Sequence, residues 1–191
     1  MQPLHIYICN IRSFLGKVTE LVHVVKEQDI HIVMIQESWL DASVSKIDFP
    51  NFQVLSRRDR SESCNRGGIL TLVRDDINNA VCIKVCDNAE RCWHLIQRDT
   101  DSLAICNWYL PPGDSLHEIE SLREDLTEIA SHADTILIAG DLNVHQKSWL
   151  KYSSRDSIRG ERLKDISENF GLKQFVDKLT RGEYLLDLGF L

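Results

Sequence analysis

The chain has 191 residues, of which 43% are hydrophobic and 27% charged, and its formal net charge is −7. This length and composition are typical of one soluble globular domain, spanning residues 1–191, with a substantial core. The negative charge argues against binding nucleic acid through charge alone, although a bound divalent cation can reverse the sign locally at an acidic site. No apolar run approaches the ~20 residues that span a membrane, and no secretory signal opens the chain, so we expect an intracellular protein without a membrane span.

The first part of the chain predicts a strand, a helix and a second strand. Residues 4–9 are a short β-rich apolar run. Ser13 can cap a helix, because apolar residues recur at helical spacing from Leu15 to Val25. Residues 31–35 are a second apolar strand, which leads directly into Glu37 by way of one glutamine.

The middle of the chain is a series of strands with no helix between them. The predicted strands are residues 52–55, 69–73, 81–85, 93–96 and 103–108, and a charged connector at 57–66 separates the first two. This order, with helices on either side, favours mixed or antiparallel sheets flanked by helices over a simple βαβ alternation.

Two further helices and a last strand are predicted in the C-terminal part. Asp114 can cap a helix over residues 116–129. Another helix spans about 157–170 and ends at a glycine, a typical helix-ending residue. The final strand, residues 184–191, has Asp187 inside it.

One stretch carries the densest polar chemistry, and it begins with the apolar residues 136–139, which predict a strand buried on both faces. Gly140 permits a sharp change of backbone direction. Asp141, Asn143 and His145 then alternate, and if extended geometry continues past the glycine, their side chains point to the same side. An ordinary turn is the alternative interpretation, because Gly-Asp and Asn favour turns.

Six cysteines are scattered along the chain, and we expect thiols, most of them buried, because no secretion signal accompanies them. The spacing of Cys82, Cys86, Cys92 and His94 lacks the paired short knuckles of zinc sites, so zinc is not expected. Most basic residues read as solvated surface. Those that follow residue 143 are placed for phosphate contact.

Acidic residues stand at or near the ends of three predicted strands. Glu37 and Asp141 each follow a buried strand, and Asp187 lies among apolar residues. Burying an ionised carboxylate is costly unless it is paired or binds a cation, and a salt bridge is the alternative for each acid singly. Oxygen ligands of this kind suit Mg²⁺.

The order of these motifs resembles the endonuclease/exonuclease/phosphatase family. The matching residues are Asn10, Gln36-Glu37, Trp108 to Pro112, Gly140 to Asn143, and Leu186-Asp187. Residues 36–40, 109–113, 140–145 and 180–187 look closer still to the endonuclease domain of non-LTR retrotransposon proteins, which are related to apurinic endonucleases. The resemblance implies an α/β fold, a four-layer α/β/β/α sandwich of two mixed sheets like that of DNase I.

The same resemblance implies phosphodiester hydrolysis with Mg²⁺ or Mn²⁺. Glu37 would be the main metal ligand, with Asn10 beside it. Asp141 would orient or deprotonate the attacking water, and Asn143 would stabilise charge on the phosphorane. Tyr109 would contact the phosphate or the leaving group.

Asp187 would support the family's catalytic histidine. His145, Trp149 and Arg66 are candidates for substrate contact, and Trp39 is a further candidate to line a DNA groove. Packing is the alternative for Trp39 and Trp149. We expect Trp93, Trp108 and Phe170 to lie in the core.

The family's Ser-Asp-His motif does not occur in this sequence. On the resemblance, the final strand that carries it would lie beyond Leu191, so we expect a domain incomplete at its C-terminus and little activity from this polypeptide. The hypothesis is a DNA endonuclease that nicks target DNA for retrotransposition, with a reverse-transcriptase domain downstream and a nuclear location. The alternatives are a catalytically silent remnant that folds without turnover, and a phosphatase of the same family.

Overall fold

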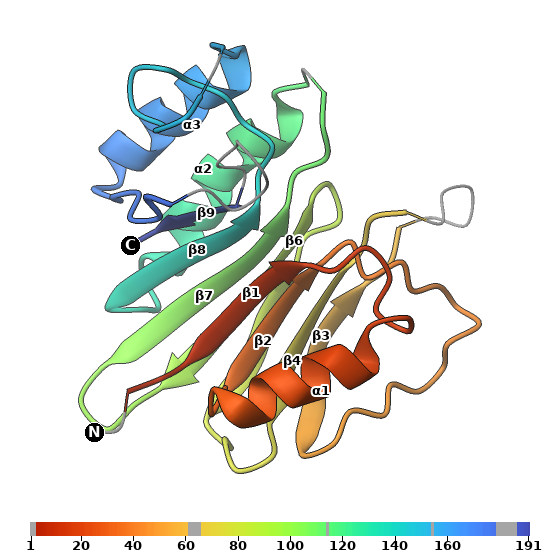
Figure 1. The fold of residues 1–191 in the computed structure, drawn as a ribbon. Coiled ribbons are helices and arrows are strands. Elements are labelled where there is room, and N and C mark those ends of the chain that lie inside the picture. The colour runs from red at the N-terminus through yellow and green to blue at the C-terminus, as the bar shows by residue number, and fades with distance from the viewer. Residues whose placement is uncertain (1–2, 61–65, 114, 154, 179–186) are drawn as a thin grey trace.

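The computed structural model of the chain describes residues 3–60, 66–113, 115–153, 155–178 and 187–191. Two sheets pack face to face, and helices lie on their outer faces (Figure 1). The predicted four-layer α/β/β/α arrangement of two mixed sheets is therefore confirmed. Within these ranges, no helix is both long and apolar enough to cross a membrane.

The first sheet has four strands in the order β1-β2-β4-β3. Their bounds are β1 Ile6–Asn10, β2 Ile32–Gln36, β3 Phe52–Arg58 and β4 Ile69–Arg74. β1 and β2 are parallel, and the other two pairs are antiparallel. Helix α1 (Val18–Glu27) lies on the outer face of this sheet (Figure 1).

The second sheet has five strands in sequence order. Their bounds are β5 Ala80–Val85, β6 Glu90–Gln97, β7 Ser102–Tyr109, β8 Thr135–Asp141 and β9 Asp187–Phe190. β7 and β8 are parallel, and the other pairs are antiparallel. Helices α2 (His117–Ile129) and α3 (Ile158–Asn169) cover its outer face (Figure 1).

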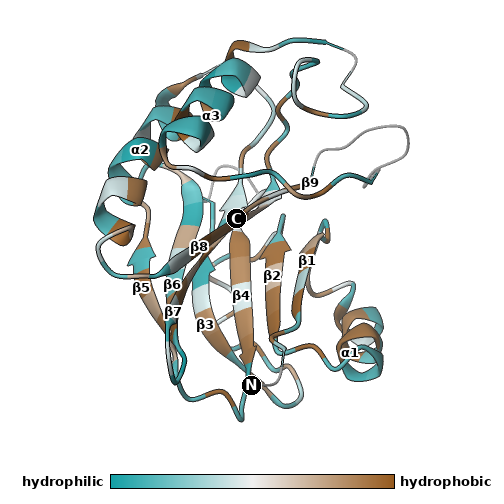
Figure 2. Cartoon of the chain, turned by 90° about the vertical axis from the view of Figure 1, so that its left-hand side faces the viewer, coloured by the Kyte–Doolittle hydropathy of each residue, from teal (hydrophilic) through white to brown (hydrophobic). Residues whose placement is uncertain are grey.

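Alternate residues of each central strand pack on opposite sides of their sheet, because successive side chains of a strand point to opposite faces. In β2, Ile32 and Met34 pack against the second sheet, whereas Val33 and Ile35 pack beneath α1. Figure 2 shows hydrophobic colouring along the strands where the two sheets face each other. This two-sided burial explains why the sequence shows continuous apolar runs there instead of an alternating pattern.

A buried ion pair fastens α2 to the second sheet. Arg91 of β6 is fully buried, and its Nε donates to Asp125 Oδ2 of α2 at 2.7 Å. Trp93 Nε1 donates to the same oxygen at 3.1 Å, and Lys84 lies 2.8 Å from the other oxygen. A buried carboxylate needs such partners, and this set supplies them.

Three sequence predictions about element boundaries are wrong. α1 begins at Val18 rather than beside Ser13, whose φ of 91° is left-handed and whose N–H donates to the Glu37 carbonyl. Leu15 is 60% exposed, so it does not extend the buried stripe of the helix. The charged connector begins after Arg58 and not at Arg57 as predicted, because Arg57 and Arg58 belong to β3 and pair with β4.

The predicted capping residue Asp114 lies outside the described residues, as do residues 184–186 of the predicted last strand. The third helix matches its prediction closely. Ser157 caps α3, and its side chain accepts from the Gly160 N–H. Of the predicted core aromatics, Trp93 and Trp108 are fully buried, and Phe170 is partly buried against the same cluster.

Candidate active site

The apolar layer between the two sheets changes to polar side chains at one end of the sandwich. Asn10 of β1 lies two residues beyond Ile8, and Asp141 of β8 lies two residues beyond Ala139, so each continues an inward-facing row. Gln36 of β2 and Asn107 of β7 end their rows in the same way. β6 runs in the opposite direction and begins at this end with Glu90.

Asn10 connects the two sheets at this end. Its Nδ2 donates to Glu37 Oε1 at 2.6 Å and to Asp141 Oδ2 at 2.7 Å. Glu37 follows a strand of the first sheet and Asp141 ends a strand of the second. The structure thus brings Asn10, Glu37 and Asp141 together, with two carboxylates held on one neutral amide.

Glu37 reaches this position through left-handed backbone. Regular alternation after the inward-facing Gln36 would direct Glu37 toward the α1 side, but its φ of 52° turns the chain. Trp39 has the same φ, and such conformations cost about 1–3 kcal/mol each in non-glycine residues. Backbone hydrogen bonds hold the segment on both sides, from Ser13 N to the Glu37 carbonyl and from Ser38 N to the Gly68 carbonyl.

Tyr109, the last residue of β7, lies beside these acids. Burial raises the pKa of its phenol, and the nearby carboxylates of Glu37 and Asp141 raise this pKa further. The guanidinium of Arg60 lies 5.8 Å from the Tyr109 ring centroid and opposes that shift. Arg60 is itself held by Glu90, to which its Nε donates at 2.6 Å. The phenol therefore stays protonated at neutral pH.

Extended geometry does not continue beyond β8, so the prediction that Asp141, Asn143 and His145 share one side is wrong. Asn143 has a φ of 46°, a left-handed conformation that asparagine tolerates better than most residues. Its Nδ2 donates to the Leu110 carbonyl at 3.1 Å, and Leu110 N donates to the Asp141 carbonyl at 2.9 Å. These bonds tie the segment after Asp141 to the segment after Tyr109.

Asp187 begins β9 and lies directly opposite Asp141 in the antiparallel register. Its carboxylate is near Cys9 of β1, where burial first and Asp187 second raise the pKa of the thiol to about 12. Asp187 therefore lies within the group of strand ends that carries Asn10 and Asp141.

His145 and Trp149 are positioned by α3. The His145 carbonyl accepts from the Ser157 hydroxyl at 2.8 Å, and burial lowers the pKa of its imidazole. Trp149 Nε1 donates to the Gly160 carbonyl at 3.2 Å, and its ring packs 5.9 Å from that of Phe190. These contacts give Trp149 a packing role. Substrate contact by either residue stays a prediction.

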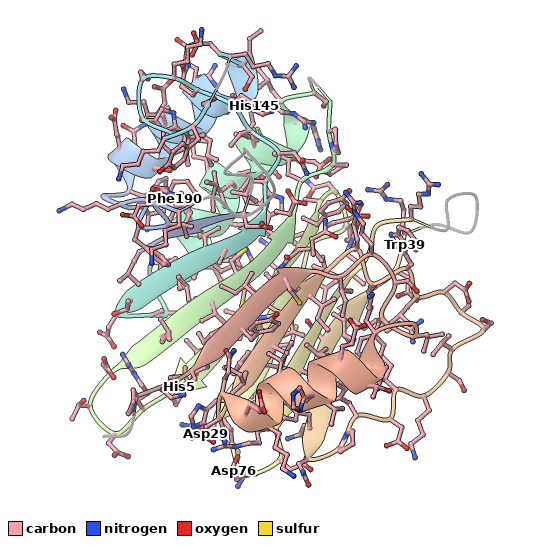
Figure 3. The ribbon with its side chains drawn as sticks, in the orientation of Figure 1. His5, Asp29, Trp39, Asp76, His145 and Phe190 are labelled. Atoms are coloured by element: carbon pink, nitrogen blue, oxygen red, sulfur yellow. The ribbon has the colours of Figure 1, made fainter. Side chains whose placement is uncertain are left out.

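Trp39 also belongs to this site. From the sequence alone, it could either line a DNA groove or pack in the protein. Its Nε1 donates to Glu37 Oε2 at 3.2 Å, and the guanidinium of Arg66 lies 5.9 Å from its ring centroid. Figure 3 shows Trp39 and His145 on the side of the molecule where β1 and β8 end, and His5 and Asp76 at the opposite end. Arg66 thus lies beside Trp39, and substrate contact by Arg66 stays a prediction.

The donor set fits a hard divalent cation better than zinc. Asn10 Oδ1 is buried and has no hydrogen-bond partner among the residues that the structure describes. Together with Glu37 and Asp141 it offers oxygen ligands, and Mg²⁺ typically binds one or two carboxylates and keeps several waters. In the same described ranges, no group of three or more His, Cys, Asp or Glu side chains could hold a metal. Such groups are typical of structural zinc sites.

Part of the chain matches a known family model. Residues 103–188 match a family model described as endonuclease-reverse transcriptase. This segment runs from β7 through α2, β8 and α3, and it ends within β9. No curated protein sequence matches the chain significantly.

Solved structures of nucleases share the fold. The endonuclease domain of TRAS1, a telomere-specific non-LTR retrotransposon, aligns with a TM-score of 0.75 at 18% identity, covering 99% of this chain and 84% of that one. The AP endonuclease LMAP from Leishmania major gives 0.70 at 14% identity, with 97% and 77% covered. The 3′ phosphatase NExo from Neisseria, bound to a product DNA hairpin, gives 0.64 at 13% identity, with 90% and 72% covered. The chain therefore has the fold of the endonuclease/exonuclease/phosphatase family, in a form similar to the endonuclease domain of a non-LTR retrotransposon.

Proposed function

We propose that this chain hydrolyses phosphodiester bonds of DNA with a bound divalent cation, Mg²⁺ or Mn²⁺. One observation carries the proposal: the carboxylates of Glu37 and Asp141, from different sheets, meet on the amide of Asn10. The amide donates to both carboxylates but is neutral, so it supplies no positive charge against the repulsion between them. A cation at this point would, and Asn10 Oδ1, which has no hydrogen-bond partner among the described residues, would become a ligand for it if the amide turned over.

Each residue of the site would have a different role in the reaction. Glu37 and Asn10 would hold the cation, which when bound supplies positive charge to the phosphate oxygens. Asp141 would accept the proton of the attacking water. Tyr109, whose raised pKa keeps it neutral, would donate its O–H to a phosphate oxygen. Asn143 uses one N–H bond on Leu110 and would direct the other at the charge developing on the phosphorane oxygens.

The retroelement role is the finer part of the proposal. The family description of residues 103–188 and the likeness to the TRAS1 domain support target DNA as the substrate. On this proposal the domain nicks DNA for reverse transcription, works with a reverse-transcriptase domain and acts in the nucleus. Cleavage of a single strand of duplex DNA is then the reaction to measure.

A supercoiled-plasmid nicking assay with Mg²⁺ tests the activity. Nicking is expected from the wild type, and it should disappear with a chelator and in Glu37→Gln. The matched control is Glu27→Gln, which removes the same charge from an exposed position on α1 and should leave nicking unchanged. Loss of nicking in Glu37→Gln excludes a contaminating nuclease, and unchanged nicking in Glu27→Gln shows that the loss comes from the site.

Two outcomes would overturn the proposal in different ways. Hydrolysis of a phosphomonoester without nicking, dependent on Glu37, would assign a phosphatase. Binding of Mn²⁺ with neither reaction would assign a silent remnant. The assay should run at high enzyme concentration, so that slow nicking is detected.

A further inference from the structure

Two buried amides lie directly beneath the candidate site. Gln36 and Asn107 are both fully buried, and each follows apolar residues of the layer between the sheets. Gln36 Nε2 of the first sheet donates to Asn107 Oδ1 of the second at 2.7 Å. The apolar layer thus ends in a hydrogen bond across the two sheets before the acids begin.

Asn107 makes further contacts with the opposite sheet. Its Nδ2 lies 3.3 Å from the Ile35 carbonyl, 3.2 Å from the Leu70 carbonyl and 3.1 Å from Thr71 Oγ1. An amide has two N–H bonds, so these three acceptors share them. One side chain of β7 is therefore attached to both β2 and β4.

The position of these contacts along the strands is what links them to the site. Gln36 immediately precedes Glu37, and Asn107 lies two residues before Tyr109. Asn107 also pairs in register with Ala139, two residues before Asp141. The bridge therefore joins the strand that delivers Glu37 to the strands that deliver Tyr109 and Asp141.

Apolar packing alone would fix this offset poorly, because hydrophobic burial is non-directional. Hydrogen bonds weaken steeply when their distance and angle change. Leaving a buried donor or acceptor unsatisfied costs about 1–3 kcal/mol, so sliding one sheet against the other carries a penalty at this point. Few arrangements of the sheets keep the Gln36–Asn107 bond and the contacts of Asn107 Nδ2 together.

We propose that the Gln36–Asn107 bridge positions Glu37 relative to Asp141 and thereby sets the affinity of the site for a divalent cation. This inference rests on the proposed function, since it concerns the same site. Both residues act through the strands that carry the acids and are positioning residues. Neither touches the cation.

A second bond across the sheets supplies a matched control. Ser56 of β3 and His94 of β6 are buried, and Ser56 Oγ lies 2.7 Å from His94 Nε2. β3 is an edge strand of the first sheet, and β2, which leads to Glu37, is separated from it by β4. Breaking this bond should lower stability without changing the geometry of the acids.

The experiment measures Mn²⁺ affinity by electron paramagnetic resonance and the free energy of unfolding for each variant. Asn107→Leu, Gln36→Leu and the double variant are compared with Ser56→Ala. Each single leucine variant should weaken Mn²⁺ binding roughly 10–100-fold, as loss of a group that orients a ligand usually does. The double variant should lose no more than the worse single one, because the two residues act as a unit.

The outcomes separate the inference from the proposed function. If the wild type binds no Mn²⁺, the proposed function fails. If the wild type binds and Gln36→Leu binds equally well, the inference is overturned, whatever its effect on stability. Should Asn107→Leu fail to fold, Gln36→Leu still decides, because it leaves the Asn107 contacts with Leu70 and Thr71 in place. Equal weakening by Ser56→Ala would also overturn it.

Discussion

Asn10 and Asp141 are 131 positions apart in the sequence, yet Asn10 Nδ2 donates to Asp141 Oδ2 at 2.7 Å. The bond joins the ends of a strand in the first sheet and a strand in the second. The candidate site is therefore a product of how the two sheets pack. No single loop contains it.

Asn10 should contribute to the stability of the protein without metal. Asn10→Leu removes two hydrogen bonds to carboxylates, each worth about 1.5–3 kcal/mol. Asn10→Asp should destabilise the metal-free protein more, because it adds a third negative charge. The order should reverse with saturating Mn²⁺, since a carboxylate at position 10 beside that of Glu37 strengthens cation binding. Thermal unfolding with and without Mn²⁺ measures both effects.

The control for this comparison is Asn88→Asp, which adds the same charge at an exposed turn. Its melting temperature should respond to Mn²⁺ as the wild type does. If Asn10→Asp is as stable as Asn10→Leu without metal, the prediction is contradicted. That result would show that the side chain at position 10 does not interact electrostatically with the carboxylates of Glu37 and Asp141.

Asp141 and Asn143 are expected to affect the chemical step more than binding. Asp141→Ala should lower single-turnover cleavage roughly 10²–10⁴-fold, the usual range for a group that handles a proton in the transition state, and Asn143→Ala roughly 10²–10³-fold, the usual loss for a donor to developing charge. DNA affinity, measured by fluorescence anisotropy with Ca²⁺, should change far less. Arg66→Ala is the contrasting variant and should mainly weaken binding. Equal losses of cleavage and affinity in Asp141→Ala would contradict the assigned role.

Sequence patterns predicted the strands and helices well, because continuous apolar runs mark strands that are buried on both faces. They also singled out Glu37 and Asp141. The roles of Gln36 and Asn107 were missed, although a signal existed. Gln36 ends the inward-facing apolar row of β2, and Asn107 interrupts that of β7 two residues before the strand ends.

Two kinds of feature, left-handed turns and the start of a helix, could not be predicted from the local sequence. The left-handed turns at Glu37 and Asn143 depend on hydrogen bonds from segments distant in the chain, such as Ser13 and Leu110. The same holds for the start of α1. Local spacing favoured an earlier first turn, but Ser13 is held in a non-helical conformation by the loop that carries Glu37.

The stability of the folded protein should decrease as pH falls, because of His94. Burial lowers the pKa of its imidazole to about 4, whereas the unfolded chain has a pKa near 6.5. The unfolded state therefore binds a proton that the folded state does not, and stability is lost as pH falls from about 6.5 to about 4. The full loss amounts to about 3 kcal/mol.

The measurement is the free energy of unfolding in urea at several pH values. His94→Gln should flatten the dependence over this window, and His23→Gln, at an exposed position, should not. An unchanged pH dependence in His94→Gln would mean that His94 is protonated inside the folded protein.

Gly140 should be nearly intolerant of substitution. A Cβ there would lie 1.9 Å from the Trp108 carbonyl oxygen, and its φ is 148°. Gly140→Ala should therefore destabilise the protein by more than about 3 kcal/mol, since neither strand can move without breaking its pairing. Gly171→Ala shares the positive φ but meets nothing within 4 Å, so strain of about 1 kcal/mol is expected. Similar losses in both variants, measured in urea, would contradict this explanation.

Titration of the wild-type chain with Mn²⁺, followed by electron paramagnetic resonance, tests the central claim most directly. The site formed by Asn10, Glu37 and Asp141 predicts one bound ion that Mg²⁺ displaces. Glu37→Gln should weaken binding at least about tenfold, which corresponds to about 1.4 kcal/mol, and Glu27→Gln should not. Binding of no ion by the wild type, or equal affinity in Glu37→Gln, would show that these residues do not form a metal site.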